Sequence, residues 1–106
     1  MYLPEVFKKF IEHHGEIAGK FKEVGDLCSK AGKLETKTQH LIQLGISIGA
    51  GSTGGVKSHS RRALEAGASH DDLLQATLLS ATVIGFPAMI AAYGWVEEVI
   101  SHVDAK

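Results

Sequence analysis

Residues 36–67 read TKTQHLIQLGISIGAGSTGGVKSHSRRALEAG, and this stretch decides the fold. It consists of an apolar run, a glycine-rich break, and a second segment that carries His59. The apolar run has two interpretations, a β-strand or an α-helix, and each implies a different class of protein.

The strand interpretation rests on alternation followed by glycines. Apolar side chains occupy every second position, which is typical of a half-buried strand: Ile42, Leu44, Ile46 and Ile48. Gly49, Gly51 and Gly54 then match G-x-G-x-x-G, the dinucleotide-binding fingerprint. In that motif the glycines let the backbone approach a pyrophosphate at a helix N-terminus.

The helix interpretation rests on a polar stripe. His40, Gln43 and Ser47 recur at helical spacing and would share one face of a helix. The glycines would then only break the chain between two helices. The remainder of the sequence has to decide between the two interpretations.

The N-terminal third is helical by its pattern. Pro4 suits the first turn of a helix. After Gly15 an apolar seam repeats at four-three-four-three spacing, as in an amphipathic helix, and consists of Ile17, Phe21, Val24, Cys28 and Ala31. Because free cysteines are commonly buried, we expect Cys28 to be a small buried apolar side chain.

Helix punctuation continues after the central stretch. Gly67 is expected to end the helix of His59, and Ser69 with Asp72 forms an S-x-x-D capping box for the next helix. The apolar side chains that this next helix is expected to bury are Leu74, Leu78 and Ala81.

A second break, Gly85-Phe86-Pro87, precedes the last expected helix. Its apolar seam suits close helix packing and consists of Met89, Tyr93, Val96, Ile100 and Val103. Everything outside residues 42–48 is therefore expected to be helical. A dinucleotide-binding domain needs several parallel strands, so it is only a remote alternative. The phosphate loop G-x-x-x-x-G-K-[ST] is not matched, because Val56 and not glycine precedes Lys57.

Composition limits the partners. The chain has 106 residues, enough for one domain spanning 1–106. With 11 basic and 12 acidic residues and no basic block, nucleic acid is not an expected partner. The single cysteine excludes an internal disulfide. No signal peptide and no apolar run of membrane-spanning length is present, so we expect a cytoplasmic protein without a membrane partner.

The order of these elements resembles the carboxymuconolactone decarboxylase and alkylhydroperoxidase D superfamily. The matching segments are LPEVFKKF, LIQLGISIGAG, SHSRRALEAGAS and HDDLLQATLLSATVIGFPAM. The resemblance covers nearly the whole chain and selects the helical interpretation. It implies an all-α fold of about six helices that intertwines as a homotrimer or a hexamer.

The redox members of this superfamily carry E-x11-C-x2-C-x3-H, whose cysteines form a peroxide-reducing disulfide. Aligned on His59, the cysteine positions here are Ser52 and Gly55, and the glutamate position is His40. A thiolate is the nucleophile in that reaction, and neither serine nor glycine replaces it. We therefore expect no thiol peroxidase activity.

The decarboxylase members are more similar, because they lack the cysteines and keep the histidine. This resemblance implies a small carboxylated or lactone substrate, with His59 as general acid/base, His40 as its partner and Ser52 as a polar substrate contact. Histidine suits proton transfer near neutrality. The chain departs from the family at His40 and at Gln75, where many members have glutamate.

Ordinary structural interpretations exist for the same residues. His59 could be a satisfied core histidine, and His40 could belong to a solvated face. Zinc normally takes three or four protein ligands, and no acidic third ligand is evident, so neither a metal nor a cofactor is assigned. The alternatives to the enzyme are a non-catalytic oligomeric member of the fold and a protein that binds a small ligand or a metal.

Overall fold

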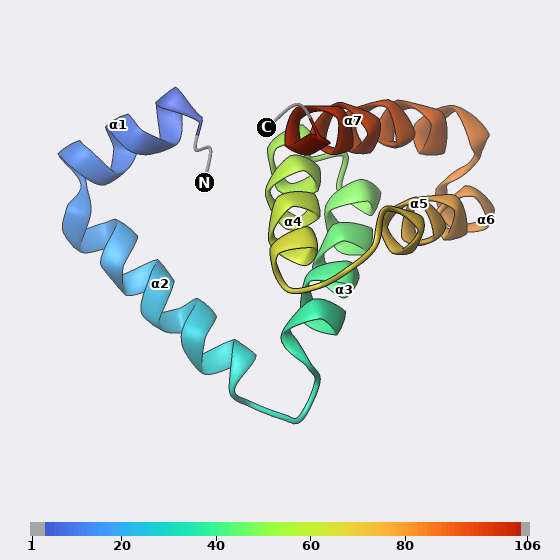
Figure 1. The fold of residues 1–106 in the computed structure, drawn as a ribbon. Helices are drawn as coiled ribbons and strands as arrows, with labels where there is room; N and C mark the ends of the chain where they lie inside the picture. The colour runs from blue at the N-terminus through green and yellow to red at the C-terminus, as the bar shows by residue number, and fades with distance from the viewer. Residues whose placement is uncertain (1–3, 105–106) are drawn as a thin grey trace. The chain divides into compact units, whose positions relative to one another are not determined.

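The computed structural model describes residues 4–104, and all regular structure in this range is helical (Figure 1). The helices are α1 (Glu5–His13), α2 (Gly15–Ser29), α3 (Thr36–Gly49), α4 (Thr53–Glu65), α5 (His70–Leu79), α6 (Ala81–Ile84) and α7 (Phe86–Asp104). The expected all-α class is confirmed. The strand interpretation of residues 42–48 is wrong, because this run lies inside α3.

The fingerprint glycines join two helices. Gly49 is the last residue of α3, and Gly54 lies in the first turn of α4. Between them Gly51 has a φ of +67°, a left-handed conformation that glycine adopts without strain. The glycines therefore reverse the chain between α3 and α4 and do not follow a strand. The parallel sheet of a dinucleotide-binding domain is absent from residues 4–104.

The chain divides into two compact units, Met1–Lys33 and Leu34–Lys106. In the first unit neither α1 nor α2 has a buried residue. The expected burial of Cys28 is wrong, because this cysteine is exposed. Within its unit α2 contacts only α1, and this contact leaves apolar side chains of both helices exposed.

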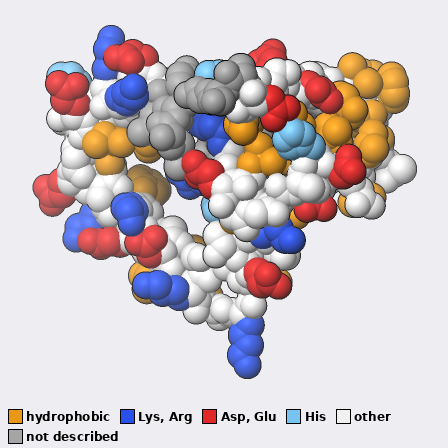
Figure 2. Space-filling model, in the orientation of Figure 1, with side chains coloured by type: hydrophobic (Ala, Val, Ile, Leu, Met, Phe, Trp, Pro, Cys, Tyr) orange, Lys and Arg blue, Asp and Glu red, His pale blue; other side chains and the backbone are white. Residues whose placement is uncertain are grey.

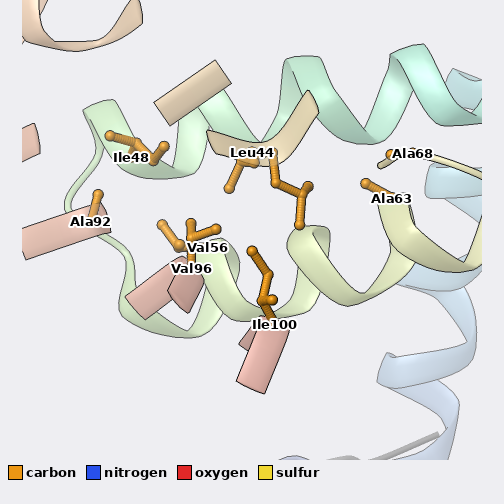
Figure 3. Packing of buried hydrophobic residues seen from close by; sticks show 9 residues of the cluster. Leu44, Ile48, Val56, Ala63, Ala68, Ala92, Val96 and Ile100 are labelled. Carbon is orange, nitrogen blue, oxygen red and sulfur yellow. The ribbon is translucent and has the colours of Figure 1, made fainter. Parts of the chain in front are cut away.

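The second unit holds the hydrophobic core (Figure 3). α3 and α4 pack against each other more extensively than any other pair of helices, and α7 packs against α4 and α5. The buried cluster draws on α3, α4, α5, α7 and the turn after α4, and it comprises Leu44, Ile48, Val56, Ala63, Ala68, Leu73, Ala92, Val96 and Ile100. These contacts fix the relative position of α3 and α4, the helices that carry the histidines of interest.

The turn before α5 has the expected chemistry. Gly67 has a φ of +102°. The Ser69 hydroxyl accepts a hydrogen bond from the Asp72 backbone N–H at 3.0 Å, and the Asp72 carboxylate accepts one from the Ser69 N–H at 3.0 Å. The capping box is thus present in both directions.

The buried face of α5 differs from the expectation. The buried residues of this helix are Leu73 and Thr77, whereas Leu78 is 51% exposed. Thr77 satisfies its hydroxyl by donating to the Leu73 carbonyl at 2.8 Å. The rotation of α5 about its axis follows from its packing on α3 and α7, and a hydroxyl bonded within its own helix can be buried at little cost.

Gly85, with a φ of +96°, turns the chain from α6 into α7. Of the apolar seam on α7, Met89, Val96 and Ile100 are buried, as the spacing predicts. Apolar side chains are also displayed on the surface around α6 and the start of α7 (Figure 2), where Val83 is 81% exposed. The second unit therefore has a formed core and an uncovered apolar surface beside it.

Candidate functional site

The polar faces of α3 and α4 meet at two histidines. His40 Nδ1 lies 3.3 Å from His59 Nδ1, and the ring centroids are 5.5 Å apart with an interplanar angle of 31°. When both rings are neutral, one donates its Nδ1–H to the lone pair of the other Nδ1. The two residues are 19 positions apart in the chain, so the pairing is a product of the α3–α4 hairpin.

Both imidazoles are partly buried, and this sets their protonation. Burial is the main cause that lowers the pKa of His59 below 6.5, and His40 and the Arg62 guanidinium lower this pKa further. Burial and then Arg62 lower the pKa of His40 as well, against a hydrogen bond with Gln43 and the charge of Glu65, which raise it. The pair is therefore mainly neutral at neutral pH.

A second polar cluster lies further along the same interface. Ser52 is the N-cap of α4, and its hydroxyl accepts the Gly55 backbone N–H at 3.1 Å. Ser47 lies against Gly55 from α3, since a Cβ added at Gly55 would be 2.6 Å from the Ser47 hydroxyl. Ser52 is on the same side of α4 as His59 but two turns away, about 10 Å along the axis.

The structure also contains a cavity, and it lies elsewhere. Its volume is about 480 Å³, and it is an open pocket between α3, α5 and α6. From α3 it is lined by Leu41, Gly45 and Gly49 among others, and from α5 by Gln75. His40 and His59 are not among its lining residues. The histidine pair therefore lies between α3 and α4, whereas the cavity lies on the side of α3 that is next to α5.

Within residues 4–104 no group of three or more histidine, cysteine, aspartate or glutamate side chains is placed to hold a metal ion. No helix in this range is long and apolar enough to span a membrane.

Fold and site together define an all-helical protein whose polar centre is a pair of facing imidazoles on a helical hairpin. The chain belongs to the carboxymuconolactone decarboxylase family, whose model matches residues 4–98. The resemblance inferred from the sequence is confirmed by this match. The comparisons with curated proteins and with solved structures gave no match.

The sequence identified part of this arrangement. His40 and His59 are brought together by the structure, whereas Ser52 is bonded within its own helix turn. Arg62 was missed, although it lies three residues after His59 and so on a neighbouring position of the same helix face. Ser47 was noted only as part of a polar stripe, because its approach to Gly55 depends on how closely α3 and α4 pack.

Proposed function

We propose that this protein acts on a small carboxylated or lactone substrate by acid–base chemistry centred on His59. His40 is the hydrogen-bonded partner that orients the His59 ring and exchanges a proton with it. The observation that carries this proposal is the 3.3 Å contact between the two Nδ1 atoms. A side chain with an accessible ring nitrogen and a titratable neighbour is suited to proton transfer near neutrality.

The local charge favours an anionic substrate. The Arg62 guanidinium lies near enough to both imidazoles to lower their pKa values. A substrate carboxylate beside Arg62 would offset that positive charge and raise the pKa of His59 toward its ordinary value. Binding of the substrate would thus shift His59 from a neutral base toward a protonated acid.

This sequence of states fits a decarboxylation. When a carbon–carbon bond breaks with loss of CO2, the electron pair left on the carbon skeleton has to be protonated. His59 in its protonated form supplies that proton, and the reaction needs no thiol. We accordingly propose that the protein has no peroxidase activity, because Ser52 and Gly55 occupy the cysteine positions of the redox members.

Ser52 has a narrower part in this proposal. Its hydroxyl oxygen accepts the Gly55 N–H, but its hydroxyl hydrogen is able to donate to a substrate oxygen. Because Ser52 lies about 10 Å from His59 along the helix axis, it would contact only a part of the substrate that extends away from the histidine pair.

The proposal is tested by thermal stability in the presence of a panel of small carboxylic acids and carboxylated lactones. A ligand that binds the folded state raises the melting temperature. We expect stabilisation by at least one compound, and we expect His59→Gln to abolish it. The matched control is His70→Gln, because His70 lies on α5 and pairs with Asp104 at 3.5 Å.

Compounds that stabilise the protein are then tested for CO2 release. Turnover by the wild type that is lost in His59→Gln and kept in His70→Gln would support the acid–base assignment. Equal stabilisation of the wild type and His59→Gln by every active compound would contradict it.

One observation favours a second candidate, a non-catalytic member that binds a ligand or only assembles. The cavity of about 480 Å³ has the volume of a small-molecule site, yet it is not lined by the imidazole pair. Ligand stabilisation that survives His59→Gln but is lost in Gly45→Leu, which would fill the cavity from α3, would favour this candidate.

We further propose that the chain assembles as a homotrimer or a dimer of trimers and works in the cytoplasm. The support for assembly is the apolar surface left uncovered in each unit, including Phe21 of α2, which is 73% exposed, and Val83 of α6.

A further inference from the structure

The separation of the two Nδ1 atoms fits a shared metal ion as well as a hydrogen bond. Two nitrogens held at about 2.0–2.1 Å by one tetrahedral Zn²⁺ ion lie about 3.3–3.4 Å apart. The observed separation of His40 Nδ1 and His59 Nδ1 is 3.3 Å. A right-angled pair of ligands at the same bond length would lie closer together, about 2.9 Å apart. The spacing therefore matches the tetrahedral edge.

The geometry points to a Zn²⁺ site formed by the Nδ1 atoms of His40 and His59, with water in the remaining coordination positions. Both residues lie within helices that pack closely, so the two nitrogens are held before the ion arrives. Both side chains are also partly exposed, which leaves an approach for the ion and room for its water ligands. Imidazole nitrogen is a ligand that zinc accepts readily.

The surroundings of the pair contain groups that support a bound cation and one that opposes it. Gln43 hydrogen-bonds to His40, as the outer partners of metal-binding histidines commonly do. The Arg62 guanidinium acts on both rings, whereas the Glu65 carboxylate acts with the opposite sign on His40 alone and less strongly than Arg62. Arg62 therefore opposes the ion, and its removal is expected to strengthen Zn²⁺ binding.

Binding requires a change of tautomer and no release of a proton. In the neutral hydrogen-bonded pair one ring carries its hydrogen on Nδ1 and the other on Nε2. For both Nδ1 lone pairs to bind Zn²⁺, the first ring moves its hydrogen to Nε2, so both rings become Nε2–H tautomers. The ion takes the place of the shared hydrogen between the two Nδ1 atoms.

With only two protein ligands, binding is weaker than at a structural zinc site with four. The test titrates the metal-free protein with Zn²⁺ by calorimetry. Loss of an outer partner alone weakens metal binding by about 10–100-fold, so His40→Gln and His59→Gln are each expected to weaken it by at least about tenfold. His70→Gln is the matched control, because His70 and Asp104 form another pair of possible metal ligands outside the proposed site. This variant is expected to bind Zn²⁺ as tightly as the wild type does.

Arg62→Gln keeps both imidazole rings, so it tests the site without relying on variants that would also lose binding if they failed to fold. Removing a nearby charge at an exposed site changes affinity by about 1.5- to 5-fold, and Arg62→Gln is expected to tighten Zn²⁺ binding by that factor. Long-range ¹H–¹⁵N correlation spectra report which ring nitrogen carries hydrogen. Saturation with Zn²⁺ is expected to leave both His40 and His59 in the Nε2–H form.

Three results would overturn the site: no Zn²⁺ binding by the wild type, binding by His40→Gln or His59→Gln as tight as that of the wild type, or loss of binding in His70→Gln. The outcome is separate from the acid–base proposal. Carboxylate-dependent stabilisation is measured in the presence of a chelator, where the metal site is empty, and Arg62→Gln is expected to weaken carboxylate binding while it tightens Zn²⁺ binding.

Discussion

Gly55 lies where α4 approaches Ser47 of α3 closely. A Cβ at this position would be 2.6 Å from Ser47 Oγ, 2.9 Å from Ser52 Oγ and 3.0 Å from Ser47 Cβ. The hydroxyls can rotate away, but Ser47 Cβ is fixed to its helix. The residue is therefore glycine for reasons of space, and its backbone N–H also serves the Ser52 cap.

We predict that Gly55→Ala destabilises the protein by about 1–2 kcal/mol, because overpacking a close contact typically costs about 1–3 kcal/mol. The measurement is the urea midpoint at a fixed protein concentration. The matched control is Gly54→Ala in the same turn of α4, where an added Cβ meets nothing within 4 Å. Replacing glycine by alanine in an open helix position stabilises by about 0.5–1 kcal/mol, so the two variants should change stability in opposite directions.

The histidine pair predicts how stability depends on pH. The pKa values of His40 and His59 are lowered in the folded protein below their ordinary value of 6.5. Between the lowered and the ordinary pKa the unfolded chain binds more protons than the folded one. Stability is therefore greatest above pH 6.5 and is lost as the pH falls through the folded pKa values.

The measurement is the urea midpoint across this pH range. A double variant with glutamine at positions 40 and 59 cannot charge there, so its stability should be less sensitive to pH in the same window. Asp72 also has a lowered pKa, chiefly because its carboxylate accepts the Ser69 backbone N–H, but its ordinary value is 3.8. Its effect is thus separated from that of the histidines by pH. An equal slope in the double variant would show that other groups cause the dependence.

At the residue scale, the sequence predicted which residues form the candidate site better than it predicted the burial and the neighbours of each side chain. His40 and His59 were paired through the family pattern, since spacing within one helix cannot reveal a partner 19 residues away. Cys28 was expected to be buried because its residue type usually is, yet burial depends on what α2 packs against. Arg62 has no motif of its own and is recognised only by its effect on the imidazoles.

At the scale of the elements, helix ends were the most predictable feature. Ser69, Asp72, Gly67 and Gly85 act through local chemistry, namely caps and left-handed turns, and that chemistry is present in the residues themselves. The rotation of α5 was not predictable in the same way. The helix presents Leu73 and Thr77 to the core because it packs against α3 and α7. The Thr77 hydroxyl donates a hydrogen bond to the Leu73 carbonyl, which satisfies it in the core.

The cap of α5 yields a prediction at this scale. Ser69→Ala removes the acceptor for the Asp72 N–H and should destabilise the protein by about 1 kcal/mol, as loss of an N-cap side chain typically does. Chemical denaturation at constant protein concentration measures the change. The control is Ser101→Ala in α7, an exposed serine within a helix, which should have little effect or stabilise slightly. Similar losses in both variants would contradict a special role for Ser69.

At the scale of the whole molecule, the uncovered apolar side chains predict self-association. α2 alone exposes Ile17, Phe21 and Val24, and monomeric proteins rarely expose large contiguous apolar patches. Light scattering at micromolar concentration is expected to give the mass of a trimer or a hexamer. Phe21→Asp is expected to reduce that mass, because a charge would then have to be buried in the interface.

Lys20→Ser is the control for this experiment. It changes an exposed polar residue of the same helix, beside Phe21, and should leave the mass unchanged. A monomeric wild type would refute the assembly. An unchanged mass in Phe21→Asp would show that the interface does not include this face of α2.

α3 serves two neighbours with two different sets of side chains. One set consists of His40, Gln43 and Ser47, which belong to the histidine pair and the polar interface with α4. The other set consists of Leu41, Gly45 and Gly49, which line the cavity beside α5. Because a helix separates such positions by about 100° per residue, a substitution in one set leaves the other set in place. Single substitutions in α3 can therefore change the size of the cavity without changing the histidine pair, or change the histidine pair without changing the cavity.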